Sequence, residues 1–191
     1  HGQVAAGFSQ IASIDGVQLY QKGYSGGAPD QVIVVDLNKA HVRSFAGAAK
    51  ANGNGPLGGP NPLFKRQSLG TFWNQIKGAH PKAFAVVNGQ FFSTAANPAP
   101  LAFSVRADGA VLSDGYGIKS EFQGQMRLLR MDGPNGVASV VNFSEAALED
   151  PLGAPEMVAA LDVAANKGPS NKVGRTFVGV RDPNKDGKNE H

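Results

Sequence analysis

The sequence predicts an α+β domain with mixed or antiparallel β-sheets and one or two helices. Three observations support this prediction. Glycine and proline are abundant, with 25 and 12 of the 191 residues, whereas charged residues make up only 17%. Short apolar stretches of strand length recur along the chain and are separated by turn residues. Clear helical periodicity is concentrated in one segment, which argues against a helical bundle.

The first third of the chain predicts strands and a long loop. Residues 14–20 and 31–37 have the composition of strands, and a glycine-rich loop over 22–30 separates them. Residues 42–45 are a short stretch that would extend the sheet. Residues 48–62 consist largely of Gly, Asn, Pro and Ala without periodicity, which predicts a long loop. A surface insertion explains this loop better than a functional role does.

Residues 68–77 carry the clearest helix signal. Ser68 is a suitable N-cap, and Gly78 is suited to end the helix. Four large apolar side chains fall on one face of the predicted helix, as expected for a helix that covers a sheet. This face consists of Leu69, Phe72, Trp73 and Ile76.

An apolar run follows the helix and ends in a polar amide. Residues 83–87 are all apolar, too few to cross a membrane, and predict a buried strand. Asn88 then places an amide at the strand end, and Gly89 permits a turn or the close approach of a ligand. Phe91 and Phe92 are suited to wall a pocket. A strand followed by an ordinary turn explains the same pattern equally well.

The second half predicts two hairpins. Strands over 102–105 and 110–112 flank Asp108-Gly109, a favoured two-residue turn. Strands over 127–131 and 136–143 form the second hairpin, which Asp132-Gly133 closes.

The remaining segments complete the predicted order. Residues 144–150 are short and polar. Residues 157–165 are apolar and fit a helix or a strand, because periodicity does not separate the two over so short a run. Residues 175–180 predict a strand, and residues 182–191 a polar loop.

Composition excludes several classes of function. The net charge is only +3 and no block of consecutive basic residues occurs, which argues against a nucleic-acid partner. No apolar stretch reaches the roughly 20 residues of a membrane span. Cysteine is absent, which excludes disulfides and thiolate metal sites and suits an exported or a cytosolic bacterial protein. The length predicts a single domain over 1–191.

Two short strings resemble signatures of the phosphodiester glycosidase family. Residues 88–92 read Asn-Gly-Gln-Phe-Phe and resemble the family's Asn-Gly-Gly-Phe-Phe. Residues 174–180 are similar to its Pro-Arg-Thr-Ala-Ile-Gly-Val segment, and residues 17–20 and 31–37 to its opening strands. The resemblance covers 16–186. It implies a phosphodiester glycosidase-like α+β fold and a hydrolase that acts on sugar-phosphate diesters, such as the N-acetylglucosamine cap of mannose 6-phosphate.

The resemblance also implies which residues carry the chemistry. Arg175 matches the family arginine and is expected on the phosphate side, because a planar guanidinium pairs two phosphate oxygens at once. Asn88 orients the substrate through its amide without transferring a proton. An ordinary arginine at a strand end is the alternative for Arg175. The expected catalytic residues are Arg175 and Asn88, and the expected substrate-binding residues are Gly89, Gln90, Phe91, Phe92 and Thr176.

The chain departs from the family pattern in two ways. Gln90 stands where the family has its second glycine, and the sequence ends before the Asp-Gly-Arg and Leu-Asp-Gly-Gly-Gly-Ser motifs would occur. We therefore expect 1–191 to be the N-terminal portion of a domain. It is either truncated, or nicked after Arg181 with a C-terminal fragment still bound, or completed by a second copy. A non-enzymatic extracellular module that binds carbohydrate or forms assemblies is the alternative function.

Four carboxylates are candidates for acid–base chemistry, with no ground in the sequence for choosing among them. Two of them precede glycine, and turns explain those two better. The four are Asp108, Asp114, Asp132 and Asp162. The histidines show no zinc-site spacing.

Residues 182–187 read Asp-Pro-Asn-Lys-Asp-Gly and match the first half of a calcium loop. Asp182, Asn184 and Asp186 would supply oxygens at alternate positions, while the glutamate of the twelfth position falls beyond His191. A hairpin turn explains the string better, and calcium is the alternative. Because the first residue is His1, we also hypothesise that a signal peptide has been removed, which would make the protein secreted or periplasmic.

Overall fold

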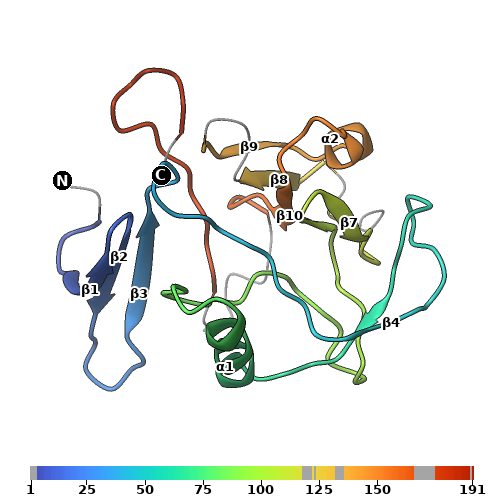
Figure 1. Cartoon of the computed structure of the whole chain (residues 1–191), viewed down its shortest axis with the longest axis horizontal. Helices are drawn as coiled ribbons and strands as arrows, with labels where there is room; N and C mark the ends of the chain where they lie inside the picture. The colour runs from blue at the N-terminus through green and yellow to red at the C-terminus, as the bar shows by residue number, and fades with distance from the viewer. Residues whose placement is uncertain (1–3, 118–121, 123, 132–135, 166–174, 190) are drawn as a thin grey trace.

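The structure is a computed structural model that describes all residues except 1–3, 118–121, 123, 132–135, 166–174 and 190. The described part contains antiparallel sheets and two helices (Figure 1). Its elements are β1 (Ser9–Ile14), β2 (Val17–Lys22), β3 (Asp30–Val35), β4 (Ala49–Lys50), β5 (Leu63–Phe64), α1 (Leu69–Ala79), β6 (Val105–Ala107), β7 (Ala110–Ser113), β8 (Met126–Met131), β9 (Ser139–Asn142), α2 (Glu145–Glu149) and β10 (Glu156–Leu161).

The largest sheet has five strands in the order β7-β6-β10-β8-β9, and every neighbouring pair is antiparallel. Both predicted hairpins are confirmed, but the first strand of the first one is wrong in its bounds, because β6 covers 105–107 and not 102–105. Asp108 and Gly109 have φ angles of 50° and 79°, the positive values that a tight two-residue turn requires. The ambiguous segment 157–165 is a strand over most of its length, because β10 lies between β6 and β8 and pairs with both.

Two hydrophobic clusters lie on opposite faces of this sheet, since successive side chains of a strand point to opposite sides. Met157 and Leu128, both 0% exposed, belong to one cluster, which Leu148 of α2 covers. The opposite cluster includes Leu129 and receives Leu37 from the segment after β3. The five-stranded sheet therefore has a packed core on both faces.

The second sheet has three strands in the order β1-β2-β3 and lies at the other side of the molecule (Figure 1). The prediction of one strand over 14–20 is wrong, because Asp15 and Gly16 form a turn between β1 and β2. Gly16 has a φ of 82°, and a Cβ there would lie 2.6 Å from the Cβ of Lys39. The turn therefore needs glycine for its backbone angle and for space.

The predicted helix is confirmed as α1. Ser68 is its N-cap and accepts a hydrogen bond from the Thr71 amide at 3.1 Å. The predicted end at Gly78 is wrong, because the helix continues to Ala79 with His80 as its C-cap. The short helix α2 was not predicted; Ser144 caps it in the same way. None of the described helices is long and apolar enough to cross a membrane.

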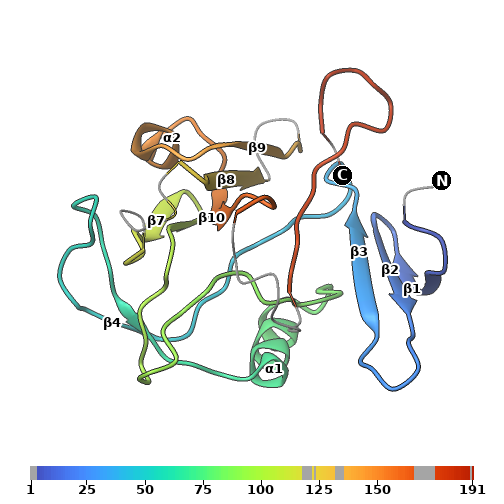
Figure 2. The ribbon, with the colours of Figure 1, turned by 180° about the vertical axis from the view of Figure 1, so that it is seen from behind.

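Three predicted strands do not form in the described structure: 42–45, 83–87 and 175–180. Each of these segments lacks a neighbouring strand, and a strand exists only where its backbone groups find partners. Val87 and Phe177 consequently remain 55% and 76% exposed. Figure 2 shows the segment after 174, in red, running between the two sheets. The predicted turn at Asp132-Gly133 lies outside the described residues.

Candidate functional site

Gln90 anchors the 88–92 motif to the middle of the five-stranded sheet. Its side-chain Nε2 donates to the carbonyl of Ala159 in β10 at 2.8 Å, and its Oε1 accepts the Phe91 amide at 2.8 Å. A glycine could make neither side-chain bond. Gln90, at the position where the similar signature has glycine, thus ties the motif to the sheet through its side chain.

The two motif aromatics remain on the surface. Phe91 is 58% exposed, although its ring contacts Phe103 edge-on with centroids 6.0 Å apart. Phe103 in turn contacts Phe122 at 6.5 Å. These three rings form a continuous aromatic group beside the start of β6. Their arrangement leaves the Phe91 ring available to an apolar face such as that of a sugar.

Asn88 and Gly89 are also exposed. Within the described residues, the Asn88 side chain makes no hydrogen bond to the protein. A Cβ added at Gly89 would meet nothing within 4 Å, and the residue does not have a positive φ. The fold itself therefore does not require glycine at position 89.

Arg66 lies against the motif, which the sequence analysis did not anticipate. Its Cζ is 5.4 Å from the centroid of the Phe92 ring. Residue 66 immediately precedes the N-cap region of α1, and no local pattern distinguishes it from a surface arginine. Only the pairing of Phe92 with Leu101 and of Phe64 with Ala99 brings the two side chains together.

Arg175 and Thr176 lie on the extended segment 175–180, and both are exposed. The structure therefore presents them to solvent, as a ligand-contacting role requires. Their predicted strand is absent, so no sheet fixes their direction relative to the 88–92 motif.

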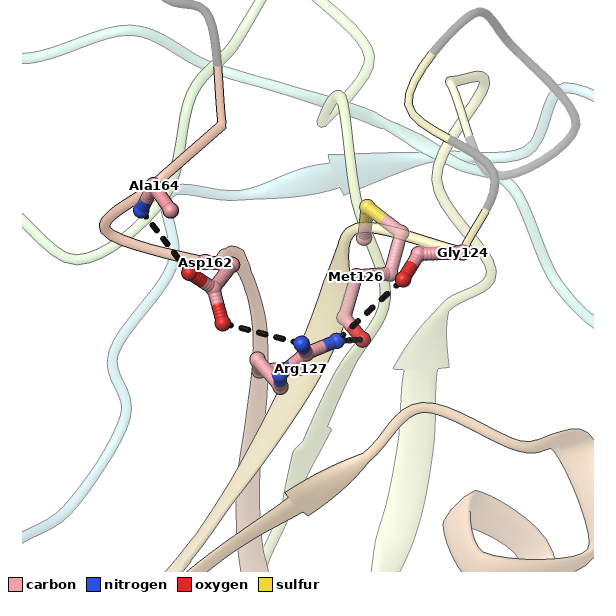
Figure 3. Close-up of polar contacts among 5 residues, drawn as sticks. All are labelled: Gly124, Met126, Arg127, Asp162 and Ala164. Carbon is pink, nitrogen blue, oxygen red and sulfur yellow. Dashed lines mark hydrogen bonds and ion pairs between the residues drawn. The ribbon is translucent and has the colours of Figure 1, made fainter.

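Among the candidate carboxylates, Asp162 lines a surface pocket. It follows β10 and forms an ion pair with Arg127 of β8, with 2.9 Å between Oδ2 and Nη2 (Figure 3). Arg127 Nη1 also donates to the carbonyls of Gly124 and Met126, and Asp162 Oδ1 accepts the Ala164 amide at 2.8 Å. The pocket has a volume of about 300 Å³ and is lined by Gln125, Arg127, Asp162, Ala164 and Ala165.

Asp114 has a structural role. The residue is 1% exposed, and its Oδ2 accepts the amides of Gly59 at 2.8 Å and Leu57 at 3.2 Å. It thereby holds the predicted 48–62 loop, which curves around a surface cavity of about 540 Å³. Asp108 is a turn residue as predicted, and Asp132 lies outside the described residues.

The 182–187 string forms a closed turn. Asp182 Oδ2 accepts the Gly187 amide at 2.8 Å, and Lys185 and Gly187 have φ angles of 62° and 90°. Arg181 and His191 exchange backbone hydrogen bonds across its base at 2.7 and 3.2 Å. The predicted turn is thus confirmed. No cluster of three or more His, Cys, Asp or Glu side chains suited to a metal ion occurs in the described part of the chain.

The chain was also compared with known proteins. No protein-family model, curated protein or solved structure matches it.

Proposed function

We propose that the chain binds a sugar-phosphate diester beside strand β10 of the five-stranded sheet and acts as part of a glycosidase-type hydrolase. The observation that carries this proposal is the 88–92 motif, which Gln90 fixes to β10 while Asn88, Gly89, Phe91 and Phe92 stay exposed. Contact with a sugar explains a tethered segment with an unpaired amide and exposed aromatic faces better than a buried strand does.

The strand to which Gln90 is tethered is followed by a carboxylate, which the proposal takes as the base. Asp162 lies three residues after Ala159, the residue to which Gln90 is tethered. In the proposed reaction, Asp162 takes a proton from water, the water oxygen bonds to the anomeric carbon, and the bond from that carbon to the phosphate oxygen breaks. The phosphate monoester leaves as an anion, so it needs little protonation. Arg127 positions the Asp162 carboxylate.

The test is hydrolysis of the methyl diester of N-acetylglucosamine 1-phosphate, followed by ³¹P NMR as methyl phosphate appears. We expect Asn88→Ala and Asp162→Asn to lower the rate at least tenfold without loss of fold. Asp15→Asn is the matched control, because Asp15 is an exposed carboxylate of the β1–β2 turn. The proposal is wrong if the wild-type protein neither binds nor hydrolyses this diester, whether alone or with a partner polypeptide.

A second candidate function is assembly, and the molecular surface favours it. The accessible surface is 11569 Å², about a third more than the roughly 8,600 Å² expected for a compact monomer of this mass. Within the described structure β3 pairs only with β2, so its other edge is open.

We propose that a strand from a second copy or from a bound fragment pairs with this open edge. Native mass spectrometry followed by denaturing mass spectrometry tests the proposal. We expect a dimer or a second polypeptide in the native spectrum. A folded monomer with no bound fragment would contradict it.

We also propose calcium for the 182–187 turn, with Asp182, Asn184 and Asp186 as the oxygen donors. Isothermal titration with calcium should give a binding heat that Asp182→Asn abolishes. Absence of both heat and a thermal shift in the wild-type protein would leave the turn as a purely structural element.

A further inference from the structure

Arg66 is held in one orientation by four contacts with the stretch 92–97. Its Nη1 donates to the carbonyls of Thr94 and Ala96 at 3.0 and 3.1 Å. Its backbone amide donates to the Asn97 side chain at 2.8 Å, and its guanidinium lies over Phe92. An exposed arginine normally samples many rotamers, so this side chain has already lost much of the freedom that ligand binding would remove.

The same contacts leave half of the guanidinium unused. Neither Nε nor Nη2 of Arg66 donates a hydrogen bond to the described residues. No carboxylate forms an ion pair with Arg66 in the described part of the chain. The Arg66 guanidinium is therefore fixed in orientation, has no carboxylate partner in the described part of the chain, and exposes the edge with Nε and Nη2. This edge is suited to bind an anion, because its two donors match two oxygens of a phosphate.

We propose that Arg66 binds the phosphate of the substrate, with Phe92 as the platform that holds the guanidinium in place. This inference rests on the proposed function and assigns the phosphate side of the same site. The sugar would then lie toward Asn88 and Phe91, on the other side of Phe92 along the motif. Arg175, the arginine expected from the resemblance, would contact the ligand from its own segment or not at all.

A purely structural role for Arg66 makes a different prediction. The bonds from Nη1 and from the backbone amide stabilise the 94–97 loop, and they do not need Nε or Nη2 to meet a ligand. If that were the whole role, Arg66→Ala would lower the melting temperature and leave ligand affinity unchanged. If Arg66 binds phosphate, affinity for the diester falls while affinity for the neutral sugar does not.

The experiment measures binding of two probes by isothermal titration, N-acetylglucosamine and the methyl diester of its 1-phosphate. We expect Arg66→Ala to weaken diester binding about tenfold or more, the loss of one charge-assisted contact. Arg66→Lys should recover part of the affinity, because it keeps the charge and loses the fork. Phe92→Leu should weaken diester binding less than Arg66→Ala does. Arg175→Ala is the matched arginine variant and should have the smaller effect.

A measurement on the wild-type protein covers the case in which Arg66→Ala does not fold. The Arg66 Nε–H resonance, assigned by its absence from the Arg66→Lys spectrum, should shift when the diester is added and not when the neutral sugar is added. An unshifted resonance in a protein that binds the diester overturns this inference alone. Failure of the wild-type protein to bind the diester overturns the proposed function together with it.

Discussion

The five-stranded sheet and the three-stranded sheet of this protein differ in how completely they are buried. In the first, Met157 and Leu128 are 0% exposed and α2 covers one face. In the second, every residue of β1 is exposed, including Ile11 at 53%. The five-stranded sheet thus has packed clusters on both faces, whereas the outer strand of the three-stranded sheet faces water. The comparison shows that deep burial is concentrated in the five-stranded sheet of the described structure.

Substitution of a fully buried and of a highly exposed side chain should give the largest difference in the free energy of unfolding. Met157→Ala removes a side chain from the closed core and should lower the free energy of unfolding by about 2–5 kcal/mol. Phe177→Ala removes a side chain that is already 76% exposed and should change it by less than about 0.5 kcal/mol. Urea denaturation followed by circular dichroism measures both. Equal losses would mean that Phe177 is buried in solution by a partner or by another conformation.

Glu156 connects the five-stranded sheet to the segment around Ser44, which follows the three-stranded sheet in the chain. Its carboxylate is 1% exposed and accepts the amides of Ser44 and Asp108, both at 2.9 Å. Glu156→Ala would leave both amides without an acceptor and should cost about 1–3 kcal/mol for each amide that water does not reach. Glu156→Gln keeps one carbonyl oxygen and should cost less. If the two variants are equally stable, these hydrogen bonds do not hold the segment around Ser44.

Removal of a helix N-cap should have a smaller effect on stability, and this effect allows α1 and α2 to be compared. Ser68→Ala removes the acceptor for Thr71 at the start of α1 and should destabilise the protein by about 1 kcal/mol. Ser144→Ala removes the corresponding acceptor from α2, whose Leu148 is fully buried. Because α2 covers the closed core, its loss of helicity should be detected only in global unfolding, whereas α1 should also fray locally. Thermal melts and amide exchange separate the two.

The ion pair between Lys39 and Asp15 should have the smallest effect, because both side chains are exposed. The hydrogen bond to Asp15 is the main cause that raises the pKa of Lys39. A raised pKa means that any stabilisation is present at neutral pH and disappears as the pH rises through the folded-state value. Lys39→Met should therefore leave the denaturation midpoint unchanged above that pH. A midpoint that differs at high pH would show that the methylene chain of Lys39, not its charge, matters.

The sequence predicted the elements whose signals are local. Ser68 and the apolar spacing of α1 identified the helix, and Asp108-Gly109 identified the β6–β7 turn, because caps and tight turns depend on a few adjacent residues. The class of fold, with antiparallel sheets and few helices, followed from turn density. The finer assignment to a phosphodiester glycosidase-like fold stays a prediction.

Features that depend on distant residues were not predictable in the same way. Residues 83–87 and 175–180 have the composition of buried strands, but a strand needs a neighbour, and the described structure provides none. The contact of Arg66 with Phe92 likewise depends on pairings between segments about 30 residues apart. For the site, the sequence singled out the 88–92 motif as substrate-binding, which stays a prediction, whereas the direction of Gln90 became visible only with β10 beside it.

The tether at Gln90 has a consequence for local motion. The backbone amides of 84–89 have no hydrogen-bond acceptor within the described residues, whereas β10 is bonded along both edges. Amides just before the tether should therefore exchange with deuterium on the timescale of an unprotected loop, while those of β10 exchange only when the sheet opens. A ligand that engages Asn88 would have to slow the exchange of this segment, so the free energy of binding includes the cost of making the segment rigid. In this way one glutamine divides the hydrogen-bonded strand β10 from a segment whose backbone amides are unbonded within the described part of the chain.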